Sequence, residues 1–274
     1  MKARIKFQKY GPMKFIGHLD VMRYFQKVFR RANVAIEYTK GFSPHQIMSF
    51  ASPLGVGLTS DSEYLDAQFI TSEAPEIMLE KINAVLTDGF YAIGFTELRE
   101  PEPGHKVITA MSLVSSADYL VSLKDGYSIS DLIKTQQEFK EAFEKFLSLD
   151  EIVIGKKTKK SEQPVDIKPM ITMAAFDQQE YEEKRVQLVR EVITSNQAHR
   201  VQSRSQADCY ENGIFVYLQV ATGSANNLKP ELVMEAFYEF LEQEYQKFAW
   251  QVHRLEVYTR EESGMLVPLD QLEQ

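Results

Sequence analysis

The sequence predicts an α+β protein built of tandem ferredoxin-like domains, each a split β-α-β unit with an antiparallel sheet. Two observations predict this class. Segments in which apolar and polar residues alternate, typical of half-buried strands, are interspersed with segments whose apolar residues recur every three or four positions, typical of one helix face. In the first 98 residues these segments follow the order β-α-β-β-α-β. The second half repeats that order, although not the residue identities.

Residues 1–98 supply the elements of the first domain. We expect strands at 3–7, within 34–51, at 63–70 and at 90–98, and helices at 18–33 and from 75 onward. In the first helix the predicted buried stripe repeats at helical spacing. It consists of Leu19, Met22, Phe25, Phe29 and Ala32.

Residues 99–116, rich in Pro and Glu at their start, are predicted to be a linker. The second domain is expected at 117–274, with a helix capped by Ser130 and running to about Leu149. Its predicted strands are 119–124, 151–156, 167–176, 213–222 and 252–259, and a further helix follows residues 226–230. An insertion near 178–212 fits no clear period, and a helix and a hairpin both remain open for it.

Composition places the chain among cytoplasmic proteins. The 274 residues are 44% apolar, yet no run reaches the roughly 18 uncharged apolar residues that a membrane span needs. The basic start has no apolar stretch behind it, so a secretory signal is not expected. Cys209 is the single cysteine, which excludes an internal disulfide and a cysteine-ligated cluster or structural zinc site within this chain.

No cofactor or metal is expected. The segment at 55–57 reads GxG, but it lacks the third glycine and the parallel βαβ context of a dinucleotide site. A P-loop pattern is absent, and the histidines and carboxylates show no ligand spacing.

Charge is distributed unevenly along the chain. The net charge is −8, yet residues 1–60 contain ten Lys and Arg against Asp20 and Glu37, a local charge of +8. Residues 231–274 carry −7. Because local charge decides which face attracts an anion, the amino-terminal region is a candidate nucleic-acid surface.

The cations of the first predicted helix are the strongest candidate contacts. Arg23, Lys27 and Arg31 lie four residues apart and therefore on one side of the helix, with Arg30 next to them. Only Asp20 on that helix could pair with them. A row of this kind can follow a phosphate backbone, although a solvated helix face explains it too.

Two histidines follow short glycine motifs. His18, in the segment GHLD, falls where a strand gives way to a helix. It could cap the helix, bind an anion or act as a general acid or base. In the segment GFSPH, Gly41 and Pro44 are expected to fix a loop that displays Phe42 and His45. Such a loop, with the preceding Lys40, can hold a base or a phosphate.

These motifs resemble a bacterial family known as the radical-SAM-linked proteins, a DUF2344-type domain of unknown function. The resemblance spans nearly the whole chain and is weakest at 178–212. It rests on GHLD, FRRA, GFSPH, PLGVG and SEYLD in the first half and on DIKP, NLKPE and HR in the second. Members occur fused to, or encoded with, radical-SAM enzymes, so the resemblance implies a partner role. It carries no settled catalytic residues.

A looser resemblance links the chain to the repeat-associated CRISPR endoribonucleases, which are also tandem ferredoxin-like proteins. In that group a histidine near the first helix can act in metal-independent RNA cleavage, and His18 holds a comparable place. The glycine-rich C-terminal loop of that group is matched only faintly, by residues 221–224.

The leading hypothesis is a non-catalytic protein that binds an RNA, either tRNA or rRNA. It would present this RNA to a radical-SAM or other RNA-modifying enzyme. The expected RNA contacts are Arg23, Lys27, Arg30, Arg31, Lys40, Phe42 and His45. One alternative is a metal-independent ribonuclease with His18 and His45 as acid and base. Another is a protein–protein scaffold that does not touch RNA.

Overall fold

The computed structural model describes residues 1–99, 109–157, 162–190, 210–224 and 226–272. Within these ranges the fold is mixed α+β, with six α-helices and a large, mostly antiparallel sheet. Most of the predicted linker, including residues 100–108, lies outside the described residues. The predicted insertion begins as a helix, and its residues 191–209, among them Cys209, also lie outside.

The first half of the chain contains four strands, two α-helices and a short 3-10 helix. In chain order they are β1 (Lys2–Lys9), η1 (Gly11–Phe15), α1 (His18–Arg31), β2 (Met48–Phe50), β3 (Thr59–Gln68), α2 (Pro75–Asn83) and β4 (Phe90–Leu98).

The second half contains the remaining elements. They are α3 (Ala110–Leu113), β5 (Ser116–Leu123), α4 (Gln136–Leu147), β6 (Val153–Lys157), β7 (Glu162–Asp166), η2 (Lys168–Met170), β8 (Ile171–Ala175), α5 (Gln178–Leu188), β9 (Phe215–Ala221), α6 (Pro230–Phe240), β10 (Trp250–Arg260) and β11 (Leu266–Pro268).

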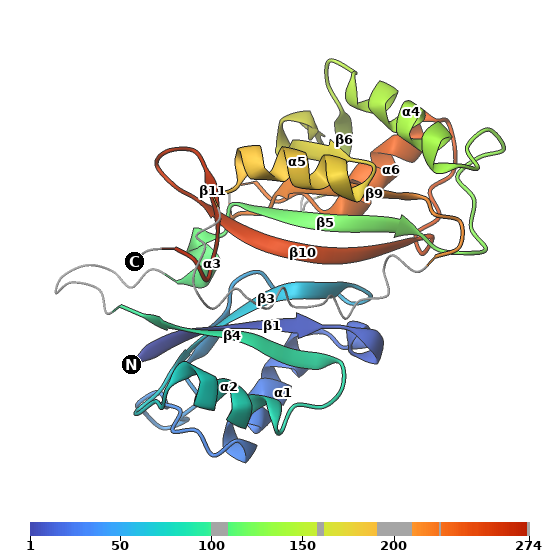
Figure 1. The fold of residues 1–274 in the computed structure, drawn as a ribbon. Helices are drawn as coiled ribbons and strands as arrows, with labels where there is room; N and C mark the ends of the chain where they lie inside the picture. Colours follow the sequence, from blue (N-terminus) through green and yellow to red (C-terminus); the bar gives the residue numbers. More distant parts are fainter. Residues whose placement is uncertain (100–108, 158–161, 191–209, 225, 273–274) are drawn as a thin grey trace.

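One sheet runs through both halves, in the strand order β4-β1-β3-β10-β5-β9-β8, with β2 added on β3 and β11 on β10 (Figure 1). Its pairs are antiparallel except where β10 meets β3. That parallel contact is short, with His253 opposite Thr59 and Arg254 opposite Ser60. The halves therefore join through a brief backbone ladder, and β6 and β7 form a separate two-stranded sheet.

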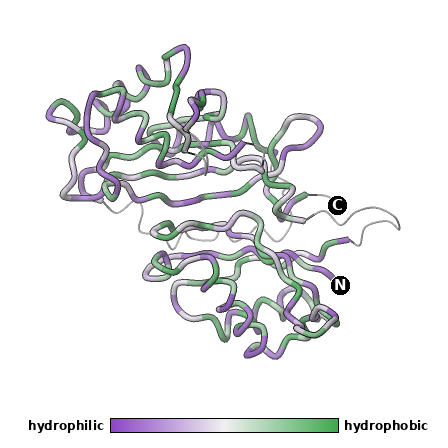
Figure 2. Tube along the Cα trace, turned by 180° about the vertical axis from the view of Figure 1, so that it is seen from behind, coloured by the Kyte–Doolittle hydropathy of each residue, from purple (hydrophilic) through white to green (hydrophobic). Residues whose placement is uncertain are grey.

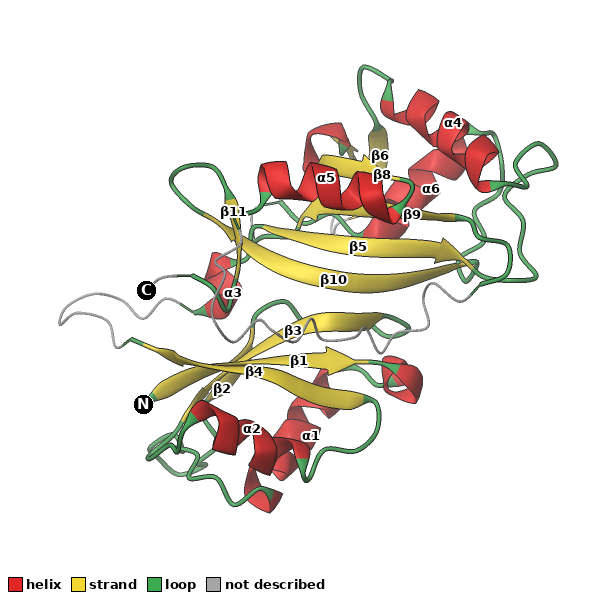
Figure 3. Cartoon of the chain, in the orientation of Figure 1, coloured by secondary structure: helices red, strands yellow, loops and turns green. Residues whose placement is uncertain are grey.

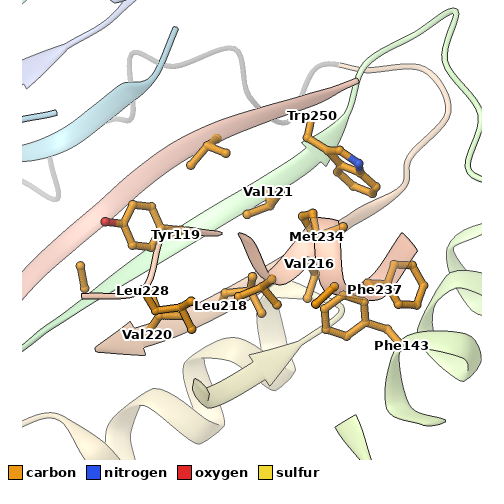
Figure 4. Close-up of a cluster of buried hydrophobic side chains, with 14 of the residues drawn as sticks. Tyr119, Val121, Phe143, Val216, Leu218, Val220, Leu228, Met234, Phe237 and Trp250 are labelled. Atoms are coloured by element: carbon orange, nitrogen blue, oxygen red, sulfur yellow. The ribbon is translucent and has the colours of Figure 1, made fainter. Parts of the chain in front are cut away.

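Each half has its own hydrophobic core. Helices α1 and α2 lie beside the β1, β3 and β4 part of the sheet, and α4, α5 and α6 lie beside β5, β9 and β10 (Figure 3). In the second core, Phe143 and Phe237 pack at 4.8 Å between ring centroids, near Trp250 and the strand residues Val216 and Leu218 (Figure 4). Hydrophobic and hydrophilic stretches alternate along the trace in both halves, as expected for amphipathic elements around two cores (Figure 2).

The predicted apolar stripe of α1 needs correction. The buried residues are Val21, Phe25, Val28 and Phe29. Leu19, predicted to be buried, is 61% exposed. Phe25 and Phe29 are buried as predicted, and the ring centroids of Phe25 and Phe7 lie 4.6 Å apart. The periodicity also admits a slightly rotated stripe, in which Val21 and Val28 join them in the core and Leu19 does not.

Several predicted boundaries also differ from the structure. Helix α4 begins at Gln136, where Thr135 and Glu138 form a capping box, and not after Ser130. In the range 34–51, where strands were predicted, residues 34–38 form only isolated bridges, at Ile36 and Tyr38. The predicted strand at 151–156 is real, but it pairs with β7 outside the main sheet. In each case a local pattern permits the predicted element, and tertiary pairing decides its extent.

A buried ion pair holds β1, β3 and the chain's second half together. Arg4 is 0% exposed and donates from Nε to Oδ1 of Asp66 at 2.8 Å and from Nη2 to Oδ2 at 3.1 Å. Its Nη1 donates to the carbonyl of Leu269 at 2.7 Å, and Asp66 also accepts from the backbone N–H of Ala110. This bidentate pair satisfies both buried charges and links three distant segments.

Replacement of this buried carboxylate is predicted to destabilise the fold. Asp66→Asn leaves the Arg4 guanidinium buried without its counter-charge, which costs about 3–5 kcal/mol in the free energy of unfolding. Glu73→Gln is the control, because Glu73 pairs with Lys81 on the surface and such pairs contribute about 0–1 kcal/mol. Urea unfolding of both variants measures the difference. Equal losses would contradict a central role for the buried pair.

Candidate functional site

Helix α1 presents its cations to solvent because its apolar side faces the first core. Gly17 is the N-cap, with φ −81° and ψ 167°, and no side chain caps the first turn. The helix ends at Arg31, and Ala32 follows as the C-cap. All four predicted cations, which we call the cation row, lie on the exposed side: Arg23, Lys27, Arg30 and Arg31.

Few carboxylates neutralise the cation row. The Oδ1 of Asp20 lies 3.5 Å from the Nη1 of Arg23. Both side chains are mostly exposed, so solvent screens this pair. Across the part of the chain that the structure describes, no carboxylate lies within 4.0 Å of the charged groups of Lys27, Arg30 or Arg31. These three cations are therefore available to an anionic partner.

The arginines at the end of α1 are held by the protein without losing their charge. Arg30 donates from Nε to the Gln26 carbonyl at 3.2 Å. Arg31 donates to the Val85 carbonyl at 2.9 Å and lies over the ring of Tyr24. Backbone carbonyls orient a guanidinium but carry no counter-charge, so each side chain keeps donors for a second partner.

The predicted loop around Gly41 is a tight, exposed turn. Thr39 closes it, because its backbone N–H donates to the His45 carbonyl at 2.8 Å and its Oγ1 lies 3.1 Å from the His45 Nδ1. Gly41 has a φ of +126°, which favours glycine at that position. Phe42 extends fully into solvent, with a relative exposure of 111%. Lys40 and His45 are exposed too, so all three predicted loop residues are accessible.

A shared hydrogen-bond acceptor joins this loop to the cation row. The Gln26 carbonyl, which accepts from Arg30, also accepts from Nε2 of Gln46 at 3.1 Å. Gln46 in turn donates to the hydroxyl of Tyr38 at 3.2 Å. The base of the loop is thus hydrogen-bonded to the backbone of α1, one turn before Arg30.

The two histidines have different surroundings. His18, the first residue of α1, packs edge-on against Phe50 with 5.1 Å between ring centroids. Burial lowers the pKa of His18, and the nearby Glu63 carboxylate partly opposes that shift. His45 is hydrogen-bonded through its Nδ1 to the Oγ1 of Thr39 in the exposed turn. Within the described ranges, no hydrogen bond or ring contact brings the two imidazoles together.

His18 lines a small cavity that the sequence did not predict. Lys9 and Glu63 line it too, together with apolar side chains of β1, α1, β2 and residues 53–54. We call it the Lys9 pocket. Strand parity could have located it, because Lys9 shares the parity of the core residues Ile5 and Phe7. The predicted strand ended at residue 7, two residues too early.

Polar and ionic side chains join the two halves. Arg254 of β10 donates from Nε to Glu63 of β3 at 2.9 Å. His253 lies 2.9 Å from Asp61, and Lys6 donates to Glu256 at 2.7 Å. Sequence spacing could not reveal these pairs, since their members are roughly 190–250 positions apart along the chain.

The local charge of +8 therefore overstates the cationic surface. Arg4 and Lys6 are buried or half-buried against carboxylates, and Lys9 is 2% exposed. The cations of residues 1–60 that are exposed are those of the cation row and Lys40.

Comparison with known proteins places the chain in a family. Residues 2–230 match the model of a family described as uncharacterized proteins conserved in bacteria, DUF2344. The chain belongs to the DUF2344 family. The matched range includes the cation row, the Gly41 turn and the lining of the Lys9 pocket, and it ends before β10. No curated protein matches the chain.

Two further properties bear on this DUF2344 chain. Among the residues with described positions, no three or more His, Cys, Asp or Glu side chains are grouped so that they could hold a metal ion. The same residues include no helix with the length and apolar character needed to cross a membrane.

The pKa of His18 yields a test of its environment. Because burial opposes the charged form, NMR titration of the folded protein is expected to give an imidazole pKa below the ordinary value of about 6.5. The unfolded chain then takes up a proton first, so stability is lost as the pH falls below about 6.5. This decline should be shallower in His18→Gln. A titration midpoint at or above 6.5 would contradict the assignment.

Proposed function

We propose that this DUF2344 protein binds structured RNA, such as tRNA or ribosomal RNA, along α1 and the Gly41 turn. The observation that carries the proposal is that the turn exposing Phe42 is joined at its base to the helix of the cation row, through the shared Gln26 carbonyl. Cations with few carboxylate partners attract phosphates, and an exposed aromatic ring offers a base a stacking surface.

Each part of this surface has a distinct role in the proposal. Arg23, Arg30 and Arg31 can grip phosphates with two N–H groups at once, whereas Lys27 acts as a point charge. Lys40 and His45 flank Phe42 and would contact the backbone of the nucleotide whose base stacks on that ring. These contacts recognise single-stranded or looped RNA better than a regular duplex, in which bases are not accessible for stacking.

We further propose that the protein is a non-catalytic partner that presents RNA to a modifying enzyme of the radical-SAM class. Support comes from the motifs shared with the radical-SAM-linked proteins and from the single cysteine, which cannot itself supply a cluster. The proposed architecture is two tandem ferredoxin-like domains. The strand orders β4-β1-β3-β2 and β10-β5-β9-β8 support it. They are equivalent when the strands of each half are counted with β6, β7 and β11 left out.

Charge reversal on α1 is predicted to abolish RNA binding. Arg23→Glu combined with Lys27→Glu removes two phosphate contacts. Where binding persists at low salt, the slope of log K against log salt should fall in magnitude by about 1.4–1.8. Fluorescence anisotropy with labelled tRNA over a range of salt concentrations measures both effects. The control is Lys145→Glu with Lys247→Glu, which changes net charge equally at exposed sites in the second half. Unchanged affinity, or an equal loss in the control, would retire the proposal.

Removal of the exposed ring is predicted to weaken binding separately. Phe42→Ala should reduce affinity by the roughly 1–3 kcal/mol of one base–aromatic stack, with little change in the salt slope. Phe248→Ala, which removes an exposed ring from the second half, is the matched control. The same anisotropy assay applies. A Phe42 variant that binds as tightly as the wild type would exclude stacking at this turn.

One incubation separates the proposal from its alternatives. Purified protein is mixed with labelled tRNA and ribosomal RNA fragments in the presence of EDTA. Binding without cleavage supports the presenting role. Cleavage that is lost in His18→Ala while binding persists supports the ribonuclease with His18 and His45 instead. If the protein binds no RNA, and a partner protein is captured equally well after nuclease treatment, the result supports the protein scaffold.

A further inference from the structure

Lys9 is the last residue of β1, and its side chain reaches the segment just before α1. Its side chain is 2% exposed, and its Nζ donates to the Ile16 carbonyl at 3.2 Å, two residues before the first residue of the helix. The ammonium therefore points toward the helix N-terminus and into the Lys9 pocket, which it lines with His18 and Glu63.

The charges around Lys9 leave its ammonium without a counter-ion. Glu63 lies nearby, but its carboxylate accepts from Arg254, which is buried as well and also donates to the Ser52 carbonyl. The positive charge of Arg254 thus balances Glu63. Lys9 makes one hydrogen bond with the described residues, to a neutral carbonyl, although an ammonium has three N–H donors. A buried ammonium in this state is costly.

The start of α1 adds further donors on the same side. No side chain caps this end of the 14-residue helix. The N–H of Asp20 bonds back to the Gly17 carbonyl at 3.1 Å, and the N–H groups of His18 and Leu19 have no partner among the described residues. The helix dipole places a partial positive charge at this end. Lys9 and His18 thus line the cavity beside an uncapped helix start.

We propose that the Lys9 pocket binds a small oxyanion, a phosphate or carboxylate group, between the Lys9 ammonium and the first turn of α1. The cavity has a volume of about 10 Å³, close to the smallest that accepts one water-sized atom, and it is partly open to solvent. It therefore takes one oxygen of the group, and the rest of the group would extend out of the cavity. This site is separate from the cation row, and its occupancy does not rest on RNA binding.

The protonation of Lys9 is consistent with this geometry. Burial lowers the pKa of Lys9, the Glu63 carboxylate raises it, and the guanidinium of Arg254 lowers it further. Of the groups that face Lys9, Glu63 comes from β3, Arg254 from β10 and His18 from α1. A bound anion restores the missing counter-charge and raises the pKa of Lys9.

Thermal unfolding of the full chain with inorganic phosphate at constant ionic strength tests the proposal. Above the Kd, each tenfold increase in phosphate should raise the Tm of the wild type by about 3 °C. Lys9→Met should lose this increase, and the exposed-site control Lys145→Met should keep it. The general stabilisation that phosphate exerts by exclusion from protein surfaces affects all three proteins alike. No difference in the phosphate-dependent increase between the wild type and Lys9→Met would overturn the proposal.

A second measurement covers the case in which Lys9→Met fails to fold. NMR of the wild type should show a saturable shift of the His18 ring signal, assigned with His18→Gln, while the His45 signal stays in place. Acetate in a parallel titration distinguishes the sources of the oxyanion, because a phosphoryl site prefers phosphate and a carboxylate site prefers acetate. A His18 signal that responds to neither anion would overturn the proposal.

Discussion

Polar and ionic side-chain contacts across the junction of β3 and β10 are the interaction on which the rest of the structure depends. The backbone ladder between these strands is short and parallel, so it contributes few hydrogen bonds. Side chains complete the junction, chiefly Arg254 with Glu63 and His253 with Asp61. Arg4 with Asp66 extends it to the carbonyl of Leu269. Buried pairs of this kind add little net stability over apolar packing, but removal of one partner is costly, so they fix which strands meet.

The same pairs determine which cations can reach a ligand. The strand β1 carries several of the basic residues that make the start of the chain positive. Its Arg4 pairs with a carboxylate of β3, and its Lys6 pairs with carboxylates of the C-terminal segment. Helix α1 lies on the other side of the first core from these pairs, so its cations meet solvent instead. Charge counted along the sequence therefore overstates the basic surface, and the fold sorts structural cations from accessible ones.

Local signals in the sequence were sufficient for the order of most elements and for the exposed candidates. Helical spacing placed Arg23 and Lys27 on one exposed face, and Gly41 with Pro44 indicated a turn that displays Phe42. Signals that depend on distant partners could not be read. The extent of β3, the separate pairing of β6 and the partners of Glu63 are decided by segments far away along the chain. Leu19 shows the intermediate case, in which a pattern fits two helix rotations and only packing selects one.

Glu63 connects the junction of the halves to the helix that bears the candidate sites. Its carboxylate accepts a hydrogen bond from Arg254 at the junction. Its charge also raises the pKa of Lys9 and of His18, which line the pocket beside the start of α1. An anion in the pocket would order the first turn of α1, while the cation row begins at Arg23, little more than one turn further along. Because a helix this short is rigid along its length, order at its start constrains the direction of the row. If both sites are occupied by ligands, each must then affect the affinity of the other by the same factor. The physical basis of the proposed coupling would be one helix whose N-terminus and exposed face bind different anions.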